Sequence, residues 1–318
     1  MSTRSDLEQM RAFVAALMTG ARDAPEPPAE LVRRNALEPL AFRRGMIEFR
    51  GDYAASLIMA ERRAALMAEV AAAMGARGVR VAPIKGMALA GWIYPDAAER
   101  PMMDIDLLVR QPRFVDAIAC MRDLGFRRGG EARKLSGYHH AIVFVRHDMM
   151  VELHRNIMQH GRTAMHMRKV WARAAPDPSV PGLERLAPED TLLYCLLHIA
   201  RSELAEPVLN YVDVARLLRA VGATGRARVL ERARAYRVGR AVDAALSMTE
   251  LLEIGASGRP EIPGGRILPR SDDVLLGVRP RRARQLAQKL LLTEGPREWA
   301  GLARAYVTAA ADGLRRGR

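Results

Sequence analysis

Strand-forming segments occupy only the middle part of this 318-residue chain. Four short β-prone runs lie between residues 79 and 165, namely VRVAPIK (79–85), MMDIDLLV (102–109), AIVFVR (141–146) and MMVELHR (149–155). The last two flank His147 and Asp148, which predicts a tight hairpin. After about residue 165 the strand signals stop. The pattern therefore predicts an α+β protein with a small mixed sheet held between helical segments.

The rest of the chain has the spacing of helices. Near the start, one face of an amphipathic helix is marked by Leu7, Met10, Phe13, Val14 and Leu17. We expect breaks at the DAPEPP segment (23–28) and near Gly51, a helix at 87–94 and another at 112–124. Later helices are predicted at 186–200, 208–220 and 281–292, with a Gly- and Pro-rich loop at 255–273. This divides the chain into N-terminal helices (1–78), an α/β core (79–165) and a C-terminal helical domain (166–318).

The composition restricts the cellular setting and the partners. No run approaches the roughly 18 uninterrupted apolar residues of a membrane helix, and the two cysteines form no CxxC motif, so we expect a soluble protein of the reducing cytoplasm. The net charge is +14, and half of this excess lies after residue 275. A solvated helical face is the favoured interpretation of that basic tail, with a polyanion site as the alternative.

The pair Asp104 and Asp106 is the sharpest chemical feature. Residues two apart on a strand point to the same face, about 6–7 Å apart. Two carboxylates on an otherwise apolar strand repel each other and lose hydration, unless a cation lies between them. Magnesium suits such a site because it binds carboxylates together with phosphate oxygens. The alternative is a strand end whose aspartates pair with arginine or cap a turn.

A third acidic residue strengthens the metal interpretation. Glu152 and His154 alternate with Val151 and Leu153, so a carboxylate and an imidazole share one face of the later strand. If the two strands are neighbours, three carboxylates converge, as two metal ions or one metal and a general base require. Lys85 and Gly86 lie where the first strand gives way to a helix, a place that attracts phosphate.

These motifs resemble those of a largely uncharacterised bacterial nucleotidyltransferase family in the DNA polymerase β-like superfamily. The resemblance rests on IKGMALAGWIYPDAAERPMMDIDLLV (84–109) and VELHRNI (151–157), and extends to LLHIAR (196–201) and YVDVARLL (211–218). Lys85-Gly86 replaces the usual Gly-Ser of the superfamily, and Glu152 stands where Asp is common.

The resemblance implies a magnesium-dependent enzyme that transfers a nucleoside monophosphate from a nucleoside triphosphate, ATP being favoured, to an acceptor hydroxyl and releases pyrophosphate. It implies metal ligation and catalysis by Asp104, Asp106 and Glu152, with two Mg²⁺ ions for which Mn²⁺ can substitute. Nucleotide binding is assigned to Lys85, Gly86, Arg100 and His154. For Arg100 the alternative is an ion pair with Asp96 or Glu99. The expected acceptor is a small molecule or peptide. The alternative functions are transfer to RNA and a non-catalytic nucleotide-binding or interaction protein.

Overall fold

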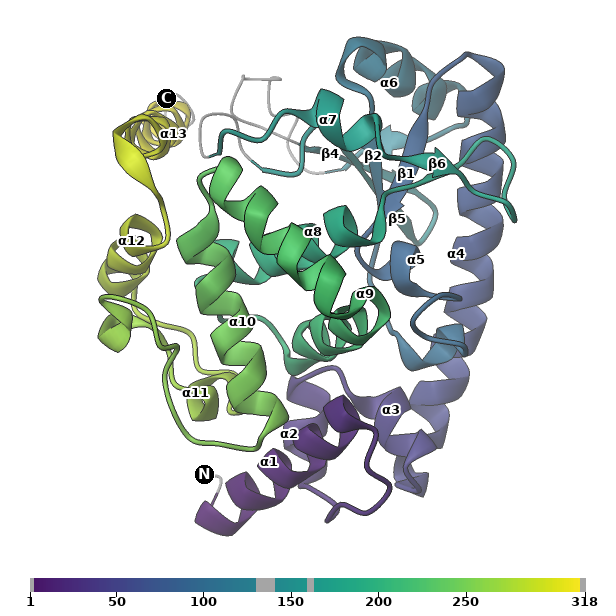
Figure 1. Ribbon diagram of the computed structural model, residues 1–318. Helices are drawn as coiled ribbons and strands as arrows, with labels where there is room; N and C mark the ends of the chain where they lie inside the picture. The colour runs from purple at the N-terminus through teal and green to yellow at the C-terminus, as the bar shows by residue number, and fades with distance from the viewer. Residues whose placement is uncertain (1–2, 130–140, 159–162, 315–318) are drawn as a thin grey trace.

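The computed structural model describes residues 3–129, 141–158 and 163–314 (Figure 1). It contains a five-stranded mixed sheet with helices before and after it in the chain, which confirms the α+β class. Tyr138, His139, His140 and the last four residues of the basic tail lie outside the described residues. Within the described ranges, no helix combines the length and the apolar character needed to cross a membrane.

The sheet brings the predicted functional segments together. Its strand order is β1 (Val81–Ile84), β2 (Ile105–Val109), β5 (Met149–His154), β4 (Ala141–Arg146) and β3 (Arg127–Arg128). β2 and β5 are parallel, whereas the other neighbouring pairs are antiparallel. The predicted hairpin is confirmed: β4 and β5 pair directly, and His147 in the turn has a φ of 54°. Parallel pairing of β2 with β5 places Asp106 opposite Glu152.

The two faces of the sheet differ in what covers them. On one face, the side chains of Ile105, Leu107, Val151 and Leu153 join a core with α4 (Arg50–Ala76) and α6 (Phe114–Asp123). On the other face, Ala82, Ile84 and Leu108 join a larger core with the C-terminal helices. Strand alternation therefore sends Asp106 and Glu152 toward the helical region and away from α4 and α6.

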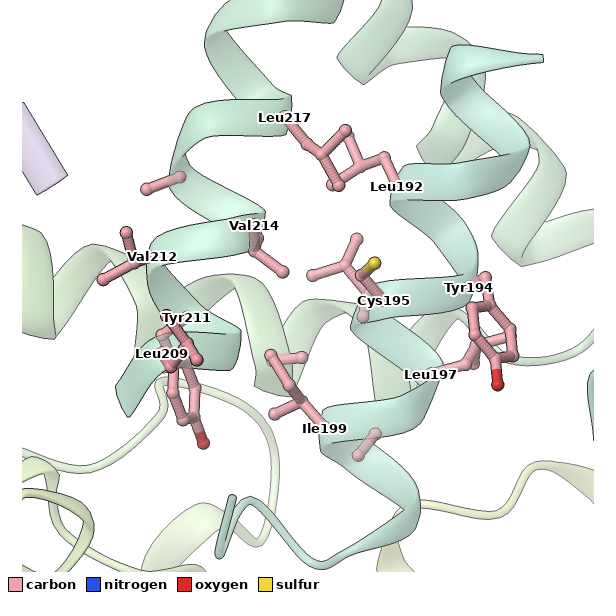
Figure 2. Packing of buried hydrophobic residues seen from close by; sticks show 14 of the residues in the cluster. Leu192, Tyr194, Cys195, Leu197, Ile199, Leu209, Tyr211, Val212, Val214 and Leu217 are labelled. Carbon is pink, nitrogen blue, oxygen red and sulfur yellow. The ribbon is translucent and has the colours of Figure 1, made fainter. Parts of the chain in front are cut away.

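Three helices form the centre of the larger core: α8 (Pro188–Arg201), α9 (Val208–Ala235) and α10 (Gly239–Glu253). Figure 2 shows Leu192, Cys195 and Ile199 of α8 pointing toward α9, where Val214 and Leu217 lie. Tyr194 lies on the opposite side of α8. One face of α8 is therefore used for helix packing, while another remains for the sheet.

The N-terminal helices pack on this same core. The amphipathic helix α1 (Arg4–Thr19) buries Met10, Phe13, Val14 and Leu17 as predicted, and a capping box of Thr3 and Asp6 fixes its first turn. It contacts α10 and α11 (Ser271–Leu275), more than 200 residues later in the chain (Figure 1). Short helices α2 (Ala29–Arg34), α3 (Glu38–Arg43) and η1 (Ile47–Phe49) connect it to α4.

Several predicted boundaries were wrong. Gly51 lies in the first turn of α4, because the chain bends earlier, around Gly45. The helix expected at 87–94 is limited to α5 (Gly86–Leu89) and turns follow it. Strands also occur after residue 165, as β6 (Ala175–Pro176) and β7 (Glu184–Arg185) form a small ladder. Two-residue strands have no periodicity that a sequence can display.

The remaining elements complete the chain. They are η2 (Ala97–Glu99), η3 (Gln111–Arg113), α7 (Met167–Trp171), η4 (Gly265–Ile267), α12 (Arg282–Leu291) and α13 (Gly295–Leu314). The helix expected at 208–220 is confirmed: α9 is interrupted at Gly222, where φ is 64° and ψ is −173°, and a second helical part follows as far as Ala235. The division of the chain at residues 78 and 165 stays a prediction.

Candidate active site

Lys85 lies at the sharp turn between β1 and α5. Its φ of 55° and ψ of −134° belong to a region that L-residues rarely occupy. Its Nζ lies 2.6 Å from Asp106 Oδ1 and 3.8 Å from Glu152 Oε2. Strained backbone of this kind persists only where the surroundings fix it, and it is concentrated at functional sites. The lysine therefore points into the acidic cluster.

Gly86 follows as the first residue of α5 and is buried. A Cβ at this position would meet the Met102 side chain at 3.2–3.4 Å, which is tighter than ordinary packing. The residue after Lys85 must therefore be small for the segment before Asp104 to pack against the turn.

Asp106, Glu152 and His154 form the centre of the site. Asp106 is opposite Glu152 in the register of β2 and β5, and His154 lies two residues further on the same face. His154 Nε2 is 2.7 Å from Asp106 Oδ1 and 3.0 Å from Glu152 Oε2. One potential ligand atom from each of the three residues lies within 4.8 Å of the others. The expected convergence of Asp106 with Glu152 and His154 is present, whereas Asp104, the third expected carboxylate, is not one of the three grouped residues.

Asp104 lies at the edge of this group. It directly precedes β2 and is half-buried. Burial raises the pKa of its carboxyl, and the negative charge of Asp106 raises it further. Asp104 is not one of the three residues whose ligand atoms are grouped within 4.8 Å. It therefore adds negative charge beside the group but is less close to its centre than Asp106.

Electrostatic interactions inside the site favour the charged forms of Glu152 and His154. Burial would raise the pKa of Glu152, but His154 and Lys85 lower it to about 2. Burial likewise opposes the charged form of His154, yet hydrogen bonds to Asp106 and Glu152 raise its pKa. Three carboxylates thus lie near the Lys85 ammonium and an imidazole whose protonated form is favoured, and the buried Arg63 guanidinium lies close enough to Asp104 to interact with it electrostatically.

Arg100 does not join this group, which corrects both expected roles. Its guanidinium is buried and donates to both carboxylate oxygens of Asp213 on α9, with Nη2 2.7 Å from Oδ2. Tyr94 also donates to Asp213, over 2.6 Å. Asp96 and Glu99 bind Tyr53 and Arg43 instead. A guanidinium bound to a buried carboxylate in this way is a structural anchor and is not placed to bind phosphate.

Two residues of α8 border the site. Tyr194 and His198 stack with ring centroids 6.4 Å apart. Burial and the positive charges of Lys85 and Arg201 lower the pKa of His198 to about 3, so this imidazole is neutral near pH 7. Nothing in the sequence indicated that Tyr194 borders the acidic residues, because helical spacing does not reveal which face covers the sheet.

The donor set fits a hard divalent cation. Carboxylate oxygens are the protein ligands that Mg²⁺ prefers, and neutral imidazole suits softer ions better. The convergence of the Asp106 and Glu152 carboxylates is the observation that supports a cation, since carboxylates held close together repel each other without one. Asp106 and Glu152 would be the main ligands, with Asp104 beside them.

Sequence comparison agrees with this geometry. Residues 35–252 match a family described as uncharacterised nucleotidyltransferase. The chain belongs to this nucleotidyltransferase family. The matched range contains the whole five-stranded sheet and helices α8 and α9, so both the acidic cluster and the helices that border it lie within it. No curated protein matches the nucleotidyltransferase.

Among solved structures, the nucleotidyltransferase is similar to the antibiotic-resistance factor ANT(2″)-Ia in two determinations. Its solution structure has 13% sequence identity and a TM-score of 0.40, and the match covers 55% of this chain and 92% of that one. Its crystal structure in complex with adenylyl-2″-tobramycin has 15% identity and a TM-score of 0.39, covering 54% of this chain and 98% of that one.

Proposed function

We propose that this nucleotidyltransferase transfers a nucleoside monophosphate from ATP to a hydroxyl of a small molecule or peptide and releases pyrophosphate. The observation that carries the proposal is the contact of Asp106, Glu152, His154 and Lys85 at the junction of three strands. The family membership gives the reaction class, and this cluster supplies the groups that the reaction needs. We also propose a cytoplasmic location, because both cysteines are buried free thiols.

Asp106, Glu152 and Asp104 would hold Mg²⁺, which supplies Lewis-acid stabilisation of the phosphate oxygens, and Mn²⁺ would substitute for it. The side chains perform the remaining steps. His154 contacts both Asp106 and Glu152, so it fixes the orientation of the two carboxylates. Lys85 supplies positive charge beside them, where it offsets the charge that develops on the leaving pyrophosphate.

The proposed transfer is balanced in atoms and protons. The acceptor oxygen forms a bond to the α-phosphorus while the bond from that phosphorus to the bridging oxygen of pyrophosphate breaks. The proton of the acceptor hydroxyl moves to the Glu152 carboxylate. Glu152 suits this role because its side chain is 26% exposed, the most accessible of the contacting residues.

The test combines metal binding with label transfer. Mn²⁺ is titrated into the protein by calorimetry, and ATP labelled at the α-phosphate is incubated with the protein and a cell extract. We expect Asp106→Asn to lose both Mn²⁺ binding and label transfer, since a ligand and its charge are removed. Asp116→Asn, a surface change on α6, is the matched control. Unchanged Mn²⁺ affinity in Asp106→Asn would refute the metal site.

Glu152→Gln separates the two roles of Glu152. This variant keeps the shape and one coordinating oxygen but removes the charge and the basicity. Loss of turnover with near-normal nucleotide affinity would indicate a general base, whereas weakening of both would indicate a metal ligand. Normal turnover would exclude both roles.

A further inference from the structure

A cavity of about 510 Å³ lies beyond the carboxyl ends of the two parallel strands. Arg110 and Gln111 follow β2, Asn156 follows β5, and residues 165–171 with α7 form the remaining wall. Carboxyl ends of parallel strands meet at one edge, which is where open α/β sheets generally bind ligands. None of the proposed catalytic residues lines this cavity.

The charges around the cavity are of one sign. Arg110, Arg168 and Lys169 line it together with His166, and among the residues that the structure describes no acidic one does. Across the described ranges, these three cations form no ion pair, whereas nearby Arg80 and Arg173 pair with Glu184 and Asp190. Unpaired cations around a concave surface concentrate positive potential there and attract anions.

The wall behind these charges is apolar and has one unused donor. Met165, Met167 and Trp171 are buried and contribute to the lining. The indole Nε1 of Trp171 is buried and has no hydrogen-bond partner among the described residues. Buried indole N–H groups usually find a partner. Cations at the rim with an apolar wall and a free donor suit a small organic molecule that carries an anionic group.

We propose that this cavity binds the phosphate of a phosphorylated small molecule, at a site separate from the acidic cluster. Guanidinium groups bind phosphate oxygens with two parallel hydrogen bonds, and lysine adds a compact charge. The volume lies within the range of roughly 300–1,000 Å³ that is usual for small-molecule sites. The assignment is independent of the transfer reaction proposed above.

Trp171 offers a direct reporter of binding. The chain has three tryptophans, and Trp92→Phe with Trp299→Phe leaves Trp171 as the only one. The probe is ribose 5-phosphate, titrated in metal-free buffer with a chelator, and ribose at matched ionic strength is the control. We expect a saturable change in Trp171 emission with ribose 5-phosphate and none with ribose. Calorimetry on the unsubstituted chain provides the same comparison if the double variant misfolds.

Charge variants then locate the binding. Arg168→Gln with Lys169→Gln should weaken affinity for ribose 5-phosphate at least about tenfold, because two of the three cations are removed. Arg122→Gln, an exposed change on α6, should leave it unchanged. Asp106→Asn should also leave it unchanged, which keeps this test separate from that of the catalytic site.

Three results would overturn the proposal. They are an equal response to ribose, an unaltered affinity in the Arg168 and Lys169 variant, and binding of an oligonucleotide without any binding of ribose 5-phosphate.

Discussion

Two groups of buried charged residues are connected by the segment 94–106, and they differ in how their charges are balanced. At its start, Tyr94 and Arg100 bind Asp213 of α9, so that one guanidinium meets one carboxylate and a hydroxyl adds a further hydrogen bond. At its end, the carboxylates of Asp104 and Asp106 lie near that of Glu152; Lys85 and His154 contact Asp106, and Arg63 lies near Asp104.

The difference distinguishes an anchor from a binding site. The Asp213 group is complete within the protein and is closed to solvent, since the side chains of Arg100 and Asp213 are 9% and 3% exposed. The acidic cluster brings carboxylates from two strands together and is partly accessible through Glu152. A closed ion pair holds segments together, whereas converging carboxylates that solvent can reach can bind a cation.

The largest expected effect is on the anchor. Arg100→Ala leaves the Asp213 carboxylate buried without its cation, so the free energy of unfolding should fall by about 3–5 kcal/mol. Equilibrium unfolding in urea measures this free energy. The double variant Arg100→Met with Asp213→Leu should recover much of the loss. Arg122→Ala, at an exposed position, should change stability by less than about 0.5 kcal/mol. A similarly small loss in Arg100→Ala would contradict the distinction.

A loss of activity is expected at the acidic cluster. Lys85→Met keeps the apolar stem but removes the charge, so turnover should fall by about 10²–10³-fold. The free energy of unfolding should also fall, because the buried Asp106 carboxylate loses the lysine of its ion pair. Lys85→Arg should retain only part of the wild-type turnover, because a planar guanidinium does not occupy the position of a compact ammonium. Steady-state rates at saturating ATP and Mg²⁺ test this. Wild-type turnover in Lys85→Met would show that the lysine has no role in the reaction.

A smaller change tests how complete the anchor is. Tyr94→Phe removes one hydrogen bond to the Asp213 carboxylate but leaves the ion pair, and should cost about 1.5–3 kcal/mol of stability. The matched control is Tyr53→Phe, whose hydroxyl binds Asp96 at a more exposed site. Equal losses in the two variants would mean that burial does not strengthen the Asp213 group.

The smallest effect concerns His198, whose imidazole interacts electrostatically with charged residues of both the acidic cluster and the Asp213 group. Burial first, and then the charges of Lys85, Arg201 and Arg100, lower its folded pKa to about 3, whereas an unfolded histidine titrates near 6.5. Between these values the unfolded state binds more protons, so stability falls as the pH falls.

His198→Asn should reduce this acid-side loss by about 1 kcal/mol or more in unfolding experiments from pH 6.5 to 4. His147→Asn, in the exposed hairpin turn, is the control. If the free energy of unfolding depends on pH in the same way for the wild type and for His198→Asn, the imidazole of His198 is not held neutral in the folded state.

The local spacing of residues was enough to determine much of the sheet. Alternation placed Glu152 and His154 on one face and Val151 and Leu153 on the other, and the packing of the two faces confirms it. The hairpin at 147–148 and the buried face of α1 were predicted for the same reason. These features depend on neighbours within a few residues, whose geometry a strand or helix fixes.

Contacts between distant segments were decided only by the tertiary structure. Arg100 and Asp213 are 113 positions apart, and no local pattern indicates that they pair. The direction of Lys85 toward Asp106, the parallel alignment of β2 with β5 and the cavity beyond their ends also depend on how whole elements pack. The sequence by itself determined which residues share a face, because that follows from backbone geometry. Which faces meet depends on the burial of the entire core, and this assigned Arg100 to an anchor instead of the active site.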